Sequence, residues 1–325
     1  MYIVTGASGL IGSALVWALN QRGIEDILAV DHLGTSEKWK NLRALRFSDY
    51  LEKDAFRKLL LENKLDTSGI KAILHMGACS STTEKDASYL VDNNFEYTKE
   101  LAGFAAQNSI RFLYASSSAT YGDGTNGFVD DENSLEKLRP LNMYGYSKQL
   151  FDLWAKREGL LGKIAGLKFT NVFGPNEYHK ADMRSVVVKS FEQVRDSGKI
   201  KLFKSGRPEY KNGEQMRDFL YVKDAVEMVF FIMDNKNVNG IFNIGSGRAE
   251  TWNSLANAVF SAMGKTPVVE YVEMPDHLKD KYQYYTKAEM GKLQNSGYTK
   301  ECRPLADSVA DYVKNYLIAG RHLGD

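Results

Sequence analysis

The stretch "TGASGLIG", residues 5–12, decides the fold of this chain. It follows the apolar run "YIVT" and leads into a segment, 11–22, whose apolar residues recur with helical spacing. Gly6, Gly9 and Gly12 permit a tight turn, let the backbone approach a pyrophosphate, and allow the helix to pack closely on the strand. The stretch therefore predicts a dinucleotide-binding turn rather than a plain connection between a strand and a helix.

The N-terminal half of the chain alternates between two kinds of segment. Short apolar runs rich in β-branched and aromatic residues are separated by longer segments with helical spacing. This alternation predicts parallel strands joined by helical crossovers, and hence an α/β fold with a doubly wound, Rossmann-like parallel sheet. The predicted strands are 2–5, 26–31, 72–78, 111–117 and 164–173, and the predicted helices are 11–22, 52–63, 86–107 and 147–158.

The regular alternation of strands and helices ends after Gly174, where a polar, lysine-rich stretch begins a mixed order of elements. The segments expected there are a strand within 217–224, a helix at 223–235, a strand within 240–247, a helix at 251–263, a strand at 268–272 and a helix at 304–318. We expect two domains with a cleft between them. Residues 1–173 with 217–247 would form the dinucleotide-binding domain, and residues 174–216 with 248–325 would form a smaller mixed α/β substrate-binding domain.

Charge and composition exclude several classes of partner. The net charge of +1 gives no basic footprint for nucleic acid or for a membrane surface. The apolar stretches are shorter than the roughly 20 residues that span a bilayer. Cys79 and Cys302 are too few for a disulfide scaffold and fit a reducing compartment. Since the sequence also carries no recognisable signal peptide, we expect a cytoplasmic location, and we expect no metal ion at the site.

The choice between two nicotinamide cofactors stays open on the residues alone. Asp31 ends the second predicted strand, where a carboxylate suits the ribose 2′-hydroxyl of NAD and repels a 2′-phosphate. Lys38, Lys40 and Lys53 follow, and the charges of one or two of them could neutralise the 2′-phosphate of NADP. They could equally be solvated lysines on a helix face.

A tyrosine and a lysine four residues apart, Tyr144 and Lys148, come after the strand that ends in Ser117. On a helix the pair shares one face, and the carboxyl end of a strand is where doubly wound sheets place their chemistry. Hydride transfer at an alcohol carbon needs a partner for the hydroxyl proton. A nearby ammonium favours the phenolate of Tyr144, and Ser117 could hydrogen-bond the substrate oxygen. An ordinary core aromatic and a strand-end hydroxyl are the alternatives.

The loop "GPNEYHKADM" (174–183) concentrates ionisable side chains after the fifth predicted strand. A solvated loop is the ordinary interpretation of such a sequence. The alternative is a second proton carrier on the wall of the cleft. His179 has the more convenient pKa for that role, whereas Lys180 could serve if burial depressed its pKa.

Six motifs resemble the extended short-chain dehydrogenase/reductase family, which contains the sugar-nucleotide epimerases and dehydratases. They are "TGASGLIG", "SSSATYG" (116–122), "YGYSK" (144–148), "NVFGP" (171–175), "RDFLYV" (217–222) and "FNIGSG" (242–247). Further segments at 75–86, 92–94, 140–148, 171–180 and 281–286 are similar to the branch that acts on an ADP-heptose.

This resemblance implies a function and a set of roles. The reaction would be epimerisation at C6 of the heptose by transient oxidation and re-reduction, for synthesis of a lipopolysaccharide core precursor, in a homo-oligomer that could be a pentamer. Tyr144 and Lys180 would be the two acid/base residues, with Ser117 and Lys148 beside them. NADP would contact Gly6, Gly9, Leu10, Ile11, Gly12, Asp31, His32, Lys38, Lys53, Met76, Gly77, Ala78, Cys79, Ser80, Asn93, Lys148, Val172 and Lys180. The nucleotide sugar would contact Ser117, Asn171, Asp182, Lys189, Phe203, Lys204, Ser205, Gly206, Arg217 and Tyr282.

The chain departs from the family pattern at Asp182, at Lys189 and along 205–218, which leaves the nucleotide and sugar open. Three rival functions differ in what they require of the site. An NAD-dependent 4-epimerase of another nucleotide sugar needs only one proton carrier. A 4,6-dehydratase needs an acidic pair where this chain has Ser118 and Ala119. A non-catalytic NADP-binding regulator could share the fold but has no use for the tyrosine–lysine pair.

Overall fold

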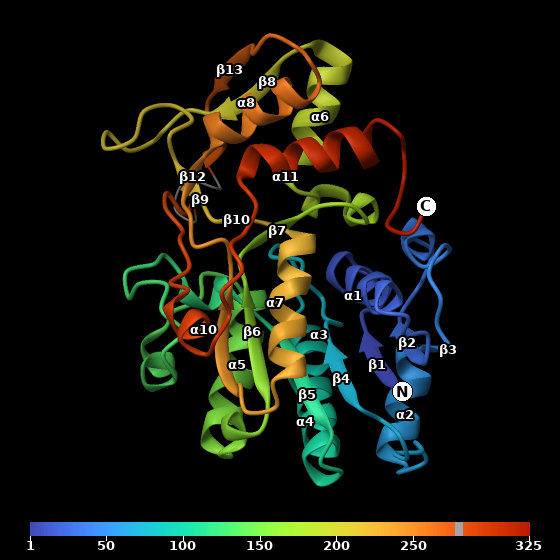
Figure 1. The fold of residues 1–325 in the computed structure, drawn as a ribbon. Coiled ribbons are helices and arrows are strands. Elements are labelled where there is room, and N and C mark those ends of the chain that lie inside the picture. The colour runs from blue at the N-terminus through green and yellow to red at the C-terminus, as the bar shows by residue number, and fades with distance from the viewer. Residues whose placement is uncertain (277–281) are drawn as a thin grey trace.

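The computed structural model describes residues 1–276 and 282–325, so Lys281 of the 281–286 motif lies outside the described residues. Its centre is a sheet of seven parallel strands in the order β11-β6-β5-β4-β1-β2-β3 (Figure 1). The predicted fold class is confirmed. The strands are β1 (Tyr2–Thr5), β2 (Ile27–Asp31), β3 (Asp49–Glu52), β4 (Ala72–His75), β5 (Arg111–Ser117), β6 (Ala165–Phe169) and β11 (Gly240–Ile244).

Helices cover both faces of this sheet. Along β1, Ile3 and Val4 point to opposite faces because side chains alternate along a strand, and the two residues belong to two separate hydrophobic clusters. The Val4 cluster contains buried residues of α1 and α7, whereas the Ile3 cluster contains those of α2, α4 and α5. These helices are α1 (Leu10–Gln21), α2 (Lys53–Leu61), α4 (Tyr97–Gln107), α5 (Met143–Arg157) and α7 (Val222–Asp234).

The strand order places a crevice at the carboxyl ends of β1 and β4. The chain runs outward from β1 through β2 to β3, then crosses back to pair β4 with the other side of β1, with Tyr2 opposite both Ile27 and Ala72. The loops after β1 and β4 therefore diverge, which opens the space in which doubly wound folds bind ligands.

A smaller region lies beyond these carboxyl ends, at the top of Figure 1. Its buried residues, including Val187, Leu255 and Val309, continue the same hydrophobic cluster as Val4. The division of the chain into two domains stays a prediction. The elements here are β7 (Asn171–Phe173) with β10 (Phe219–Tyr221), β9 (Met216–Arg217) with β12 (Glu250–Thr251), β8 (Ile200–Phe203) with β13 (Val269–Val272), α6 (Val186–Ser197), α8 (Trp252–Ala262) and α11 (Leu305–Tyr312). The short helix α10 (Gly291–Asn295) lies instead beside the large sheet, where Lys292 donates to the Ile241 carbonyl oxygen of β11 at 2.9 Å (Figure 1).

Three predicted elements are divided in the structure, and one of them is the helix expected at 304–318, which becomes α11 and a π-helical turn (Val313–Leu317). The strand expected at 164–173 becomes β6 and β7 because the backbone leaves the large sheet at Thr170, and Asn171 N then donates to Asp218 O at 3.2 Å. The helix expected at 86–107 becomes α3 (Ala87–Leu90), a π-helical turn (Val91–Glu96) and α4. Among the described residues, none of the helices combines the length and the apolar character that crossing a bilayer requires.

Candidate active site

A cleft of about 1310 Å³ opens over the carboxyl ends of the central strands. It is lined from both parts of the chain, since His179, Lys180 and Gln283 face residues that follow β1, β4 and β5. The structure brings together most of the residues expected to bind the cofactor or to act in catalysis. Those in the lining are Gly6, Gly9, Leu10, Ile11, Gly12, Asp31, Lys38, Met76, Gly77, Ala78, Cys79, Ser80, Ser117, Tyr144, Lys148, Asn171, Val172, His179 and Lys180.

The glycine turn at the base of the cleft fits a pyrophosphate. Gly6 has φ of 65°, and a Cβ at this position would lie 2.7 Å from the backbone N of Gly77. A Cβ at Gly12 would lie 2.0 Å from the carbonyl oxygen of Gly6. Gly9 is the N-cap of α1, and among the described residues no side chain caps this helix. The N–H groups of its first turn therefore stay available to an anion.

Asp31 is enclosed by donors at the end of β2. Ser8 donates to it from both its backbone N, at 2.8 Å, and its hydroxyl, at 2.6 Å. The ammonium of Lys38 lies 2.7 Å from the other carboxylate oxygen. The carboxylate that would repel a 2′-phosphate is therefore paired with a cation that lines the cleft.

Three predicted cofactor residues are not part of the described lining. Lys53 donates to the side-chain oxygen of Asn93 at 2.9 Å, beside the cleft. His32 lies at the surface, with its ring Nδ1 3.2 Å from Glu52. Whether these residues contact a cofactor stays a prediction.

Ser117, Tyr144 and Lys148 meet on one wall of the cleft. Asn142 caps α5 by accepting from the N–H of Gly145 at 2.8 Å, which fixes the first turn that carries Tyr144. Burial raises the pKa of the Tyr144 phenol, and its interaction with the Ser117 hydroxyl opposes that rise. Burial also lowers the pKa of the Lys148 ammonium to about 8, against the opposing charge of Asp152. These groups can exchange a proton with an alcohol or a carbonyl.

His179 and Lys180 line the same cleft from a 3-10 segment (Tyr178–Met183). The ring Nδ1 of His179 is 3.3 Å from the side-chain nitrogen of Asn41. Burial, with the charges of Lys180 and Lys38, lowers the pKa of His179 to about 4. His179 is thus neutral at physiological pH and lies on the Lys38 side of the cleft. Burial lowers the pKa of Lys180 too, which makes its ammonium a better proton donor.

Of the residues expected to hold the nucleotide sugar, Ser117 and Asn171 line the cleft, whereas the other eight are not part of its described lining. The Arg217 guanidinium is buried and lies 5.6 Å from the ring centre of Trp252 and 5.0 Å from that of Tyr282. Lys189 donates to the carbonyl oxygen of Asp182 at 2.6 Å. Of the remaining four, Phe203 ends β8, and Lys204, Ser205 and Gly206 follow it. The Gly206 N–H donates to the Tyr284 hydroxyl at 3.1 Å.

The sequence did not point to three residues that organise the site. Asn94, in the π-helical turn, donates to the carbonyl oxygen of Cys79 at 3.0 Å and to the Ser147 hydroxyl at 3.0 Å, which joins the loop after β4 to α5. Asn41 donates to the carbonyl oxygens of Ser8 and Asn176. Glu177 is completely buried. For Glu177 a signal existed, because it is a carboxylate in a loop that directly follows an apolar strand.

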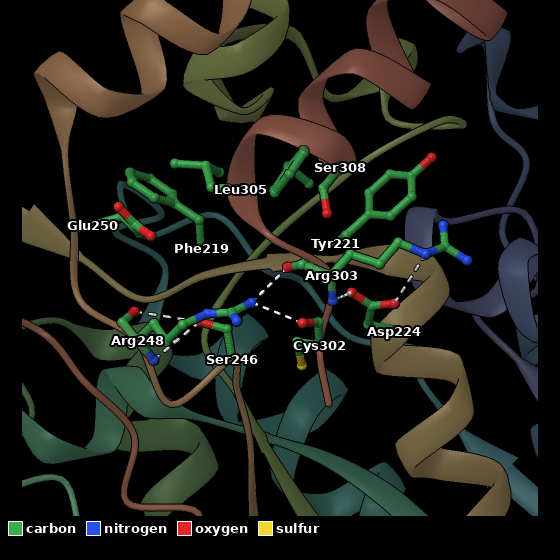
Figure 2. Close-up of a pocket in the computed structure, with 11 residues that line it drawn as sticks. Phe219, Tyr221, Asp224, Ser246, Arg248, Glu250, Cys302, Arg303, Leu305 and Ser308 are labelled. Atoms are coloured by element: carbon green, nitrogen blue, oxygen red, sulfur yellow. Dashed lines mark hydrogen bonds and ion pairs between the residues drawn. The ribbon is translucent and has the colours of Figure 1, made fainter. Parts of the chain in front are cut away.

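A second hollow lies between α7, β10 and α11 (Figure 2). Its volume is about 10 Å³, which is room for about one water molecule. Arg248 donates to the Cys302 carbonyl oxygen at 2.9 Å, and Asp224 accepts from the Arg303 N–H at 3.0 Å. Burial raises the pKa of the Cys302 thiol to about 12, so this thiol is not a reactive nucleophile. The hydrogen bonds around this hollow hold the C-terminal segment in place. The hollow itself is too small to compete with the cleft as a ligand site.

The sequence and the fold of this chain have counterparts in known proteins. Residues 2–245 match the NAD dependent epimerase/dehydratase family. The chain belongs to this family. Its membership accounts for the parallel sheet and confirms the resemblance read from the six motifs, and a nicotinamide dinucleotide is the cofactor of the family.

Two relatives match over nearly the whole chain. A protein of Nitratidesulfovibrio vulgaris named ADP-L-glycero-D-manno-heptose-6-epimerase is 54% identical, and one of Fusobacterium nucleatum with the same name is 48% identical. Each alignment covers 98% of this chain and 98% of the relative.

Solved structures of other epimerases share the fold. The ADP-L-glycero-D-manno-heptose-6-epimerase of Helicobacter pylori superposes with a TM-score of 0.80 at 22% identity, over 97% of this chain and 95% of that one. The UDP-glucose 4-epimerase of Thermus thermophilus, in complex with NAD, gives a TM-score of 0.73 at 23% identity, over 97% and 99% of the two chains. At these identities the likeness extends to the fold alone.

Proposed function

We propose that this protein interconverts ADP-D-glycero-D-manno-heptose and ADP-L-glycero-D-manno-heptose by epimerisation at C6, as a step toward a lipopolysaccharide core precursor. The observation that carries the proposal is the near-full-length match, at 54% and 48% identity, to two relatives with this name. Two proton-carrying groups that line one cleft, Tyr144 and Lys180, support it.

Tyr144 is the acid/base group of the first wall. When bound, the nicotinamide supplies the acceptor and the donor of the hydride. Tyr144 takes the proton of the C6 hydroxyl as C6 is oxidised, and the Ser117 hydroxyl holds the same oxygen. The Lys148 ammonium, two turns into α5, stabilises the phenolate form of Tyr144.

Lys180 is the acid/base group of the second wall. Inversion at an exocyclic carbon requires that the aldehyde rotate about its bond to the ring before it is reduced on the other face. The aldehyde oxygen then points away from Tyr144, and a fixed phenol cannot reach both orientations within hydrogen-bond distance. Lys180 lines the same cleft, and in our proposal it reaches the oxygen in this second orientation and protonates it.

NADP is the cofactor we propose, because the charge at Asp31 is already compensated. Lys38 pairs with that carboxylate and lines the cleft, so its ammonium can contact a 2′-phosphate at the same time. Lys53 supplies a second cation at the same end of the sheet, where β2 and β3 terminate.

We propose that Arg217 and Tyr282, with their aromatic neighbour Trp252, hold the nucleotide of the substrate. A buried guanidinium flanked by rings combines a cation for phosphate with flat surfaces for a base. Asn171, Asp182, Lys189 and residues 203–206 would hold the sugar and complete the substrate site. We further propose that the protein is a homo-oligomer of the cytoplasm, in keeping with the free thiols of Cys79 and Cys302.

The rival functions are not favoured. A 4-epimerase of another nucleotide sugar leaves Lys180 without a task, and a non-catalytic regulator leaves the Tyr144–Lys148 pair without one. The experiment is to incubate the purified protein with ADP-D-glycero-D-manno-heptose without added cofactor and to follow the two epimers by NMR. We expect the L-glycero epimer to form while no reduced cofactor accumulates. Steady formation of NADPH would instead identify a dehydrogenase.

A further inference from the structure

Glu177 is a carboxylate with no exposed surface, in the loop that carries Lys180. Its side-chain oxygens accept from the backbone N of Gly174 at 3.2 Å, from the backbone N of Ser185, and from the Ser185 hydroxyl at 2.8 Å. A buried carboxylate is costly unless it is hydrogen-bonded and balanced by charge. The three hydrogen bonds therefore offset part of the cost of burying Glu177, and they tie its side chain to Gly174 and Ser185.

These hydrogen bonds close the loop at both ends. Gly174 is where the loop leaves β7, and Ser185 is the N-cap of α6, so one carboxylate joins the two residues that flank the segment. Inside the segment the Lys180 N–H donates to the Glu177 carbonyl oxygen at 3.0 Å. Ala181 has φ of 44°, an unfavourable conformation for a residue with a Cβ that persists only where the surroundings impose it.

The charges of Glu177 and Lys180 act on one another. Burial raises the pKa of the Glu177 carboxyl, and the Lys180 ammonium opposes this rise. Burial lowers the pKa of Lys180, and the Glu177 carboxylate opposes that fall. Within the described part of the chain, the charge of Glu177 also acts on the phenols of Tyr178 and Tyr312, whose pKa values burial raises. The charge of Lys180 also acts on His179, which is neutral.

We propose that Glu177 is a positioning residue for Lys180: its carboxylate clasps the two ends of the loop and supplies the negative charge that keeps the Lys180 amine protonated. The proposal rests on the proposed function in one respect: it takes Lys180 to be a residue that transfers a proton. Glu177 does not touch the reacting atoms.

Two variants separate the clasp from the charge. Glu177→Gln keeps the length of the side chain and removes its charge, whereas Glu177→Asp keeps the charge and shortens the reach. Glu192→Gln is the matched control. Glu192 holds the same loop through Arg184, at 2.6 Å, but is not among the charges that act on Lys180.

The first measurement is the pH at which Lys180 becomes reactive. Protein saturated with NADP is pulsed with acetic anhydride across a pH series, and acetylation of Lys180 is quantified by mass spectrometry. In Glu177→Gln we expect the midpoint to move to lower pH by about one unit or more, because loss of the carboxylate removes what favours the ammonium. In Glu192→Gln and Glu177→Asp the midpoint stays at the wild-type value. A wild-type midpoint in Glu177→Gln overturns the proposal.

The second measurement is the pH profile of kcat for epimerisation. The limb that belongs to Lys180 should move to lower pH in Glu177→Gln, by the same shift as the acetylation midpoint. Glu177→Asp should lower kcat at least tenfold without moving the limb. If Glu177→Gln does not accumulate as folded protein, Glu177→Asp decides, since an unchanged kcat in that variant would overturn the proposal.

The acetylation measurement uses no substrate, so the two proposals fail separately. A shifted midpoint in a protein that does not epimerise the ADP-heptose retains the clasp and rejects the proposed function. Epimerisation by the wild type, with no shifted midpoint in Glu177→Gln, retains the function and rejects the clasp.

Discussion

The ammonium of Lys168 lies 2.9 Å from the carboxylate of Asp152, and both side chains are completely buried. They lie beneath the wall of the cleft that carries Tyr144 and Lys148, called here the tyrosine–lysine wall. Asp152 is one helical turn beyond Lys148 on α5, and it also accepts hydrogen bonds from Tyr114 at 2.9 Å and Ser116 at 2.8 Å. The pair joins β5, β6 and α5 below the candidate active site. The charge balance of this pair matters because the Asp152 carboxylate raises the pKa of the Lys148 ammonium, against the effect of burial.

Lys168→Met should destabilise the protein severely, because it leaves the Asp152 charge buried without its partner. We expect a loss of about 3–5 kcal/mol in the free energy of unfolding, measured by urea titration. The matched control is Lys156→Met. Lys156 lies on α5, as Asp152 does, and forms a partly exposed pair with Glu136, so its loss should cost at most about 1 kcal/mol. Adding Asp152→Asn to Lys168→Met should cost less than the sum of the two single losses, and simple additivity would contradict a coupled pair.

The double variant Lys38→Ala/Lys53→Ala should lose affinity for NADP far more than for NAD. Each lysine that contacts the 2′-phosphate forms a charge-assisted hydrogen bond worth about 1.5–3 kcal/mol, so we expect at least a tenfold difference between the two losses. Isothermal titration with both cofactors measures it. Lys40→Ala, which removes an exposed lysine paired with Glu37 in the same 3-10 segment, serves as the control. Equal losses for the two cofactors would make Lys38 and Lys53 structural and Asp31 the mark of an NAD enzyme.

His75 should make the stability depend on pH. Its ring nitrogens lie 2.6 Å from the Thr5 hydroxyl and 2.9 Å from the Thr98 hydroxyl, and burial lowers its pKa to about 3. Thr98 donates to the Asn94 carbonyl oxygen at 2.7 Å, so it accepts from His75, and the ring is neutral with its proton on Nε2. The unfolded chain binds a proton below about pH 6.5 and the folded chain does not, so stability falls as the pH drops from 6.5 toward 3.

A His75→Gln variant tests this dependence. Its free energy of unfolding should be lower than that of the wild type at pH 7.5, because the hydrogen bonds of the ring are lost. Between pH 6.5 and 5 it should lose about 2 kcal/mol less than the wild type, because the His75 contribution is absent. The exposed His32 provides the control, and His32→Gln should keep the wild-type slope. A His75→Gln slope equal to that of the wild type would show that this ring is protonated in the folded state.

Local sequence patterns predicted the sheet, the glycine turn and the tyrosine–lysine wall. Each of these features is recognised from residues close together in the chain. Gly6 directly follows a strand, and Lys148 lies four residues after Tyr144 on one helix. The division of 164–173 into β6 and β7 was missed, because it depends on Asp218, a partner far along the chain. The edge strand β3, "DYLE", was missed for another reason, since it has no buried residues and hence no apolar pattern.

The deeper organisation of the site depends on contacts that no spacing encodes. Lys168 and Asp152 appear in the sequence as ordinary charged residues, yet both are fully buried, because the fold brings β6 against α5. The preference for Lys180 over His179 rests on the resemblance and stays a prediction. In the structure the His179 ring lies 3.3 Å from the Asn41 side-chain nitrogen, and burial keeps it neutral.

The most direct test of the two-carrier account is the epimerisation rate of Lys180→Met, with Tyr144→Phe as its counterpart on the other wall. Both variants should nearly abolish interconversion of the two ADP-heptose epimers, followed by NMR. Each should still exchange hydride with one epimer or with an aldehyde analogue, because one proton carrier remains. A Lys180→Met protein that epimerises within about tenfold of the wild-type rate, a barrier change of only about 1.4 kcal/mol, would contradict the account.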